Sequence, residues 1–373
     1  MGTSNSERAS APKKLSAYSH SDATTLQPTQ PQIHGGTGKY RESHALTCST
    51  VFLVKALVTG GAGYIGSHLV DRLVAAGFEV AVLDDLSTGK KANIAHLGGN
   101  IEFHHDSILN ESCVDSLVKQ SDVVYHLAAA VGVGNIVAKP LDSIITNARG
   151  TDVVLQACAD HGTKVVLAST SEIYGKTSKM PMSEDDDRVL GSTSVFRWSY
   201  STAKALDEHL ALEFSRMGLP VSIVRYFNSY GPRLDFKGYA SVVANFIRQA
   251  LAGEPLTVHG DGTQSRCFTY VADTVEGTFL AGTLKAAEGS VFNIGNDTEI
   301  TVNELAGLIK RATNSSSEIV HVSYESRYGL SFEDTKRRVP DLNRARNVLG
   351  YSPTTSLDEG LRLTLDWWRR EHR

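Results

Sequence analysis

The chain has 373 residues, 41% of them hydrophobic and 21% charged, and a formal net charge of −4. This length accommodates about two folding units, and the slightly acidic balance excludes a strongly basic surface for nucleic acids or anionic membranes. The longest apolar run, residues 51–58, contains Lys55 and is too short to cross a bilayer. Four widely spaced cysteines without a CxxC pair argue against a disulfide framework or a metal site, and favour reduced thiols in a cytoplasm.

The N-terminal segment differs from the rest in composition. Residues 1–50 are rich in Ser, Thr, Gln, Pro, Gly and His and show no periodicity, which predicts a disordered tail over residues 1–53. The segment lacks the apolar core of a secretory signal, while a transit peptide is an alternative because basic residues outnumber acidic ones. Because a strand follows directly, we expect the natural start near Val54, which the intact mass of the natively expressed protein would test.

Apolar runs alternate with helical patterns from residue 55 onward. The pattern predicts one helix that ends at Gly77 and two more at 141–161 and 199–217. The predicted strands lie at 55–59, 79–83, 101–104, 122–127, 164–169 and 220–226. Such alternation with continuous apolar strands is typical of an α/β fold, a Rossmann-type doubly wound parallel sheet over residues 54–227.

The pattern becomes irregular after Asn228. We expect a smaller α/β lobe for substrate binding over residues 228–373, from which some strands can return to the main sheet. Its predicted elements are a strand at 256–259 and helices at 241–252, 273–284, 301–313 and 356–370.

A glycine-rich turn between the first strand and the first helix points to a dinucleotide. Gly60 permits the tight turn, Gly63 lets a pyrophosphate approach the backbone, and Gly66 lets helix and strand pack closely. The adjoining Tyr64 and Ile65 open the helix, whose N-terminus offers free N–H groups to phosphate.

Carboxylates at the ends of the next two strands complete this predicted cofactor site. Asp84, followed by Asp85, ends the second strand, where a carboxylate accepts both ribose hydroxyls and repels a 2′-phosphate, so NAD is favoured over NADP. Asp106, followed by Ser107, comes just after the third strand, where it suits the adenine edge. A solvated carboxylate is the alternative role for Asp106.

Tyr200 and Lys204 are four residues apart on a predicted helix and therefore share one face. A nearby ammonium favours the phenolate, so the pair can take a proton from a sugar or alcohol hydroxyl. Thr170 and Glu172 leave the carboxyl end of the preceding strand, where ligands bind in open α/β sheets. A surface lysine beside a packed tyrosine is the alternative.

Taken together, these motifs resemble the extended short-chain dehydrogenase/reductase family, in its branch of nucleotide-sugar epimerases, dehydratases and decarboxylases. The resemblance covers residues 54–370 and rests on GGAGYIGSHL, LDDLSTG, HLAAA, ASTSEIYG, YSTAK, RYFNSYGPR and GDGTQSRCFTYVAD. It implies a catalytic triad of Thr170, Tyr200 and Lys204, supported by Asn147. It further implies NAD contacts from Asp84, Asp106, Leu127, Ala128 and Ala129, and nucleotide-sugar contacts from Asn228, Arg266, Arg338 and Asp341.

The segment Thr170-Ser171-Glu172 bears on the reaction. It differs from the serine triplet of simple 4-epimerases, and Ser171 stands where dehydratases of deoxythymidine-diphosphate-glucose carry an acid. It resembles UDP-glucuronate decarboxylases and GDP-mannose dehydratases, and Arg197 favours a decarboxylase because a guanidinium before the catalytic tyrosine can pair with a carboxylate. Equally, Arg197 can pair with an acid of the loop 185–187.

The resemblance leaves other readings open. A UDP-hexose 4-epimerase acting on glucose, glucuronate or N-acetylglucosamine is the main alternative, a 4,6-dehydratase is the third, and a non-enzymatic NAD-binding scaffold or sensor is the rival from another class. The family also implies a homodimer through the helices at 141–161 and 199–217. The thirteen histidines have no metal-ligand spacing, so no metal is expected.

Overall fold

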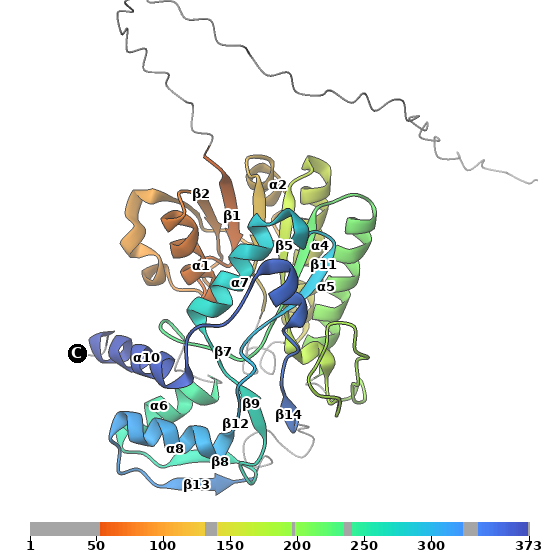
Figure 1. Ribbon diagram of the computed structural model, residues 1–373. Coiled ribbons are helices and arrows are strands. Elements are labelled where there is room, and N and C mark those ends of the chain that lie inside the picture. Colours follow the sequence, from red (N-terminus) through yellow and green to blue (C-terminus); the bar gives the residue numbers. More distant parts are fainter. Residues whose placement is uncertain (1–52, 131–139, 196–197, 235–240, 324–334, 372–373) are drawn as a thin grey trace, which may run out of the picture. The chain divides into compact units, whose positions relative to one another are not determined.

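A computed structural model describes residues 53–130, 140–195, 198–234, 241–323 and 335–371 (Figure 1). The tail predicted over residues 1–53 therefore lies outside the described residues except for Leu53. Within the described ranges, no helix combines the length and the apolar character needed to cross a membrane.

The main sheet has seven parallel strands in the order β11-β6-β5-β4-β1-β2-β3, which is a Rossmann-type arrangement extended by one strand. Its central strands are buried on both faces, as the continuous apolar runs predict, whereas the edge strand β3 has no fully buried residue. They are β1 (Lys55–Thr59), β2 (Glu79–Leu83), β3 (Ile101–His104), β4 (Val123–His126), β5 (Lys164–Thr170), β6 (Val221–Tyr226) and β11 (Ser290–Ile294).

Helices cover both faces of this sheet. On one face α1 (Tyr64–Ala75) and α7 (Val271–Thr283) pack against the strands, and on the other α2 (Glu111–Lys119), α4 (Pro140–His161) and α5 (Trp198–Arg216) do. The alternation along β5 is visible in the core, because Val166 belongs to the first face and Leu167 to the second. The doubly wound α/β fold is thus confirmed.

A smaller set of elements lies beside the carboxyl ends of the strands, below the main sheet in Figure 1. Its three helices share an apolar core with a two-stranded sheet, and two more short sheets adjoin it. The helices are α6 (Val242–Ala252), α8 (Val302–Thr313) and α10 (Leu357–Glu371). The strands are β7 (Ser229–Tyr230), β8 (Leu256–His259), β9 (Ser265–Cys267), β10 (Thr269–Tyr270), β12 (Glu299–Thr301), β13 (Ile319–Val322) and β14 (Arg337–Arg338).

The chain returns to the main sheet at β11, which pairs in parallel with β6. Short strands such as β9 and β14 were not predicted, because two or three residues carry too little periodicity to be recognised. The helix α2 was also missed, although Asn110 caps it by accepting a hydrogen bond from the backbone of Cys113.

Candidate functional site

A cavity of about 570 Å³ opens at the carboxyl ends of the central strands. It is bounded by the glycine-rich turn, by the ends of β2, β4 and β5, and by the first turns of α5. Thirteen of the fifteen residues predicted to bind the cofactor line it: Gly60, Gly63, Tyr64, Ile65, Gly66, Asp84, Asp85, Asp106, Leu127, Ala128, Ala129, Tyr200 and Lys204.

The glycines of the turn are required by close contacts. Gly60 has a φ of +72°, and a Cβ added to it would lie 2.8 Å from the backbone nitrogen of Ala128. A Cβ on Gly66 would lie 2.1 Å from the carbonyl oxygen of Gly60. Gly63 is the N-cap of α1 and has no side chain between the helix N-terminus and the cavity. This geometry gives a phosphate access to the first N–H groups of α1.

We expect Gly66→Ala to disrupt the turn. The added methyl would overlap the carbonyl oxygen of Gly60, so the turn must move, and we expect loss of dinucleotide binding together with a lower melting temperature. Dinucleotide binding by calorimetry and thermal unfolding measure the two effects. Gly99→Ala is the matched control, because a Cβ there meets no atom within 4 Å and the residue has an ordinary φ. Retained binding by Gly66→Ala would contradict the packing role.

The carboxylate of Asp84 is buried at the edge of the cavity, where it accepts hydrogen bonds from the backbone nitrogens of Ala62 (2.9 Å) and Leu86 (2.8 Å). Burial raises its pKa, and the two backbone hydrogen bonds oppose this rise. The side chain therefore holds the glycine turn and also lines the space beside it. Asp106 accepts hydrogen bonds from the backbone of Ser107 and the side chain of Asn110, each at 2.7 Å.

Two of the predicted cofactor residues, Ser107 and Asn147, do not line the cavity. Asn147 accepts a hydrogen bond from the backbone nitrogen of Ala130 and donates one to its carbonyl oxygen. Through this pair of bonds α4 holds the segment after β4 in place. Ser107 accepts a hydrogen bond from the backbone of Leu109, which shapes the loop before α2.

The predicted triad of Thr170, Tyr200 and Lys204 lines one cavity. Thr170 ends β5, and its hydroxyl accepts a hydrogen bond from the backbone nitrogen of Glu172, so its own proton is available to a ligand. Burial raises the pKa of Tyr200, and the negative charges of Glu172 and Asp207 raise it further. This direction is opposite to the one expected from a neighbouring lysine.

Burial is the main reason, and an ion pair that the sequence analysis did not predict contributes to it. The ammonium of Lys204 lies 2.9 Å from a carboxylate oxygen of Asp207, and both side chains are buried. Asp207 follows Lys204 by three residues on α5, so helical spacing would have revealed it. The Lys204 charge therefore has a counter-charge beside Tyr200.

The predicted sugar-diphosphate residues gather on the small sheet β12-β9-β14. Arg266 on β9 and Arg338 on β14 are direct partners in the register of two parallel strands, and both are buried. Asn228 donates a hydrogen bond to the carbonyl oxygen of Cys267, next to Arg266. Across from them Glu172 lies 4.0 Å from a guanidinium nitrogen of Arg338. Glu172 and Arg338, which were predicted from different motifs, thus lie close to each other.

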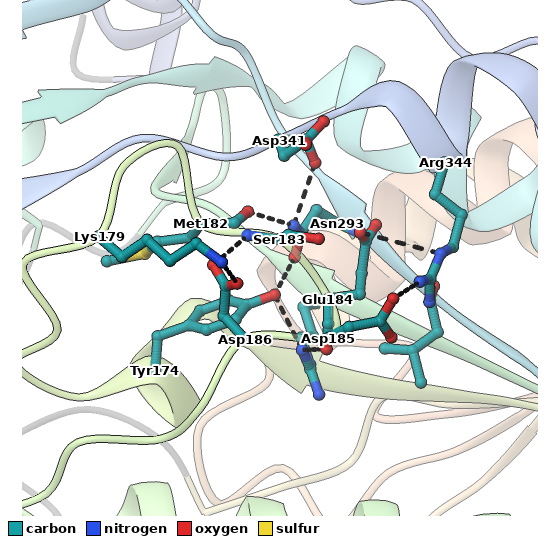
Figure 2. A network of polar contacts seen from close by, with 12 residues as sticks. Tyr174, Lys179, Met182, Ser183, Glu184, Asp185, Asp186, Asn293, Asp341 and Arg344 are labelled. Carbon is teal, nitrogen blue, oxygen red and sulfur yellow. Dashed lines mark hydrogen bonds and ion pairs between the residues drawn. The ribbon is translucent and has the colours of Figure 1, made fainter.

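A buried asparagine, Asn293 on β11, connects the segments that carry Glu172 and Arg338. Its side-chain oxygen accepts a hydrogen bond from Tyr174, two residues after Glu172. Its side-chain nitrogen donates to the carbonyl oxygens of Met182 and Asp341, the latter three residues after Arg338 (Figure 2). The predicted ligand Asp341 uses its carboxylate to accept a hydrogen bond from the backbone of Asn343.

We expect Asn293→Ala to lower the free energy of unfolding by about 2–3 kcal/mol, because buried groups lose their partners. The variant should also raise KM for substrate, since the segments of Glu172 and Arg338 lose their shared anchor. Urea unfolding and steady-state kinetics measure these effects. Asn343→Ala is the control, because that side chain is exposed. An unchanged KM in a destabilised variant would limit Asn293 to a stabilising role.

The predicted carboxylate partner Arg197 lies outside the described residues. Two of the acids proposed to pair with it have other partners: Asp185 forms an ion pair with Arg344, and Asp186 with Lys179. Among the described residues, Arg338 is therefore the arginine placed beside Glu172. Ser171 is buried and lies outside the lining of the cavity.

Comparison with known proteins gives matches over most of the chain. The family model described as GDP-mannose 4,6 dehydratase matches residues 57–364. A UDP-N-acetyl-alpha-D-glucosaminuronate decarboxylase from Bacillus cytotoxicus is 46% identical over 315 residues, which cover 84% of this chain and 98% of that protein. UDP-glucuronic acid decarboxylase 1 from Xenopus tropicalis is 37% identical over 320 residues, or 85% and 72% of the two chains.

Solved structures give the same picture of the fold. A UDP-glucose 4-epimerase with UDP-glucose from Thermotoga maritima has a TM-score of 0.78 and 36% identity, covering 86% of this chain and 100% of that one. A UDP-glucuronic acid 4-epimerase from Bacillus cereus, in complex with UDP-glucuronic acid and NAD, has a TM-score of 0.76 and 31% identity, with 86% and 100% coverage.

Proposed function

Because this chain belongs to the extended short-chain dehydrogenase/reductase family of NAD-dependent nucleotide-sugar enzymes, we propose that it decarboxylates a UDP-linked uronic acid. The observation that carries the proposal is the pairing of Glu172 with Arg338 at 4.0 Å beside the catalytic strand end. The 46% identity to a decarboxylase of UDP-N-acetylglucosaminuronate supports it and makes that compound the first substrate to test.

The cofactor we propose is NAD, bound in the cavity beside the glycine turn. The chain fits this group: the turn exposes the N-terminus of α1 for a pyrophosphate, and the buried carboxylate of Asp84 lines the place of a ribose. Asp84 also disfavours the 2′-phosphate of NADP by its negative charge. When bound, NAD would supply a hydride acceptor for C4 of the sugar and, once reduced, a hydride donor, so the cycle would be redox-neutral.

Tyr200 acts on the C4 hydroxyl in this proposal. It removes the hydroxyl proton as C4 becomes a ketone, Thr170 donates a hydrogen bond to the same oxygen, and Lys204 supports the developing phenolate. The three side chains line one cavity. Tyr200 later returns its proton to the same oxygen.

Decarboxylation then follows from the position of the ketone, since the C6 carboxylate of a uronic acid is β to C4. The C5–C6 bond breaks, CO2 leaves, and the electron pair moves onto the C4 oxygen as an enolate, which the Tyr200 proton stabilises. Arg338 holds the carboxylate by charge-assisted hydrogen bonds, and Glu172, beside it, delivers the proton that C5 needs. Arg266 and Asn228 lie next to Arg338 and suit the diphosphate.

A 4-epimerase is the second candidate, because a solved UDP-glucuronic acid 4-epimerase shares the fold at 31% identity. A dehydratase is disfavoured, since Ser171 replaces the acid that would protonate a departing hydroxyl. The purified protein should be given UDP-N-acetylglucosaminuronate, UDP-glucuronate, UDP-glucose and GDP-mannose, with products identified by mass spectrometry and proton NMR. Loss of CO2 from a uronate supports the proposal; an unchanged mass with an inverted C4 coupling refutes it in favour of an epimerase.

A homodimer completes the proposal. Leu141, Ile144 and Ile145 form one exposed apolar face of α4, and Leu206 is exposed on α5, which packs against α4. We expect Ile145→Glu to convert a dimer into a monomer, measured by light scattering after gel filtration. The control Leu251→Glu, on an exposed apolar residue of α6 outside both helices, should leave the mass unchanged. The free thiols of Cys113, Cys158 and Cys267 support a cytoplasmic location.

A further inference from the structure

Five polar side chains lie buried beneath the catalytic end of the cavity. They come from four elements and are each at most 3% exposed: Thr59 on β1, His126 on β4, Thr151 on α4, and Lys204 and Asp207 on α5. Thr59 and His126 are 2.8 Å apart between Oγ1 and Nδ1, and His126 and Thr151 are 3.1 Å apart between Nε2 and Oγ1. Lys204 and Asp207 are 2.9 Å apart.

The direction of these hydrogen bonds is inferred from the carboxylate end. A carboxylate only accepts, and the hydroxyl of Thr151 favours the charged form of Asp207, although the two side chains are not in hydrogen-bond geometry in the structure. We infer that Thr151 turns its proton toward Asp207, in which case Nε2 of His126 donates to Thr151 and Nδ1 accepts from the hydroxyl of Thr59. Burial is the main cause that lowers the pKa of His126 to about 3, and the charge of Lys204 lowers it further, so the ring stays neutral between its two threonine partners.

The first member of the chain contacts the cofactor side of the site. Thr59 accepts a hydrogen bond of 3.2 Å from the backbone nitrogen of Ala128, which lines the cavity. The last member, Lys204, lines the same cavity beside Tyr200. Thr59, His126 and Thr151 therefore tie the segment after β4 to α4, and Thr151 also favours the charge of Asp207, the partner of Lys204.

We propose that Asp207 is a positioning residue: it holds the Lys204 ammonium through the buried ion pair and cancels much of that charge beside Tyr200. The hydroxyl of Thr151, which is paired with His126, supports the charged form of Asp207. The proposal rests on the proposed function only in taking Tyr200 as the base. It does not depend on the product, because decarboxylases, epimerases and dehydratases all begin by oxidising C4.

The sign of the effect follows from the charges around Tyr200. Both Glu172, from the turn after β5, and Asp207 raise the pKa of Tyr200, in addition to burial. Glu208 on α5 forms an ion pair with Arg225, and His126 is neutral. Removing the Asp207 charge leaves Lys204 uncompensated, which favours the phenolate. Tyr200 then releases its proton at lower pH.

The test is the pH dependence of the rate of C4 oxidation in Asp207→Asn. The rate is monitored in a single turnover by the absorbance of the reduced cofactor. This half-reaction does not require decarboxylation, so its result is independent of the sugar product. We expect the acid limb of the rate profile to move to lower pH by about one unit. An acid limb identical to the wild type, with only reduced stability, would show that Asp207 has a merely structural role.

The matched control is Glu213→Gln. Glu213 pairs with Arg216 on the same helix at the same spacing of three residues, and both are exposed, so the profile should not move. If Asp207→Asn does not fold, Thr151→Val removes the hydroxyl that supports the charged carboxylate, and Thr151→Ser restores it. The valine variant should shift the limb in the same direction by less, and the serine variant should restore it; an unshifted valine variant overturns the proposal.

A second measurement needs neither cofactor nor substrate. Nitrogen-15 NMR of labelled histidine should show a neutral ring protonated on Nε2 that does not titrate between pH 5 and pH 8, as the Thr59–His126–Thr151 order requires. The signal is assigned by its absence in His126→Asn. A ring protonated on Nδ1, or one that becomes charged in this range, would overturn the inferred direction of the hydrogen bonds from Thr59 through His126 to Thr151, and with it the support that Thr151 gives to the charge of Asp207.

Discussion

Replacing Tyr200 with phenylalanine should lower kcat by about 10²–10⁴-fold and leave substrate affinity nearly unchanged. In the proposed reaction, the oxygen of Tyr200 removes the proton of the C4 hydroxyl and later returns it. Among the described tyrosines that line the cavity, Tyr200 is the one on the same helix as Lys204. Because Phe keeps the ring, packing around the first turns of α5 is preserved. Initial rates and the dissociation constant for the nucleotide sugar separate the two effects.

The control for this change is Tyr226→Phe. Tyr226 lines the same cavity, but its hydroxyl is paired with Thr278 at 2.9 Å. We expect kcat within a few-fold of the wild type and slightly lower stability, about 1 kcal/mol for a lost hydrogen bond. Equal losses in the two variants would mean that Tyr200 serves only to shape the cavity.

The part of the site proposed for the cofactor was predictable because its signals are local. Gly60, Gly63 and Gly66 fall within seven residues between a strand and a helix, and Asp84 ends the next strand, so spacing alone places them together. The structure brings these four to one cavity. The same holds for Tyr200 and Lys204, which one helical turn brings to one face.

The substrate side was less predictable because long-range pairing builds it. Arg338 lies in a strand of two residues, β14, whose register beside Arg266 depends on contacts with a strand 72 residues earlier. Asn293 has no local motif, and its role as an anchor follows from hydrogen bonds to residues 119 and 48 positions away. Without the resemblance to a family, the sequence offers no signal that unites these residues.

The expected phenolate beside Lys204 shows a different limit. Tyr200 and Lys204 line one cavity, as their spacing predicts, but the pKa of Tyr200 is raised by burial, by Glu172 and by Asp207, which lies three residues after Lys204 on the helix. A charge pattern on one helix face carries this information. Burial decides its strength, however, and burial becomes known only when α4 and α5 pack together.

The second large effect is expected at Arg338. Arg338→Met should reduce CO2 release from a UDP-uronate by about 100-fold or more, the effect of removing a positioned charged donor. Oxidation at C4 should persist, because Tyr200 and Thr170 are untouched. We therefore expect reduced cofactor and a 4-keto uronate to accumulate, measured by absorbance and by mass spectrometry of the trapped product.

The chain provides a matched control in the preceding residue. Arg337 shares the strand β14 with Arg338, but its side chain is 55% exposed and pairs with Glu299, whereas Arg338 is buried beside Glu172. Successive residues of a strand point to opposite faces, so Arg337→Met removes the same charge from the other face and should leave CO2 release within a few-fold. If Arg338→Met lost C4 oxidation and CO2 release together, Arg338 would bind the diphosphate rather than the carboxylate. The carboxylate partner would then have to be sought elsewhere.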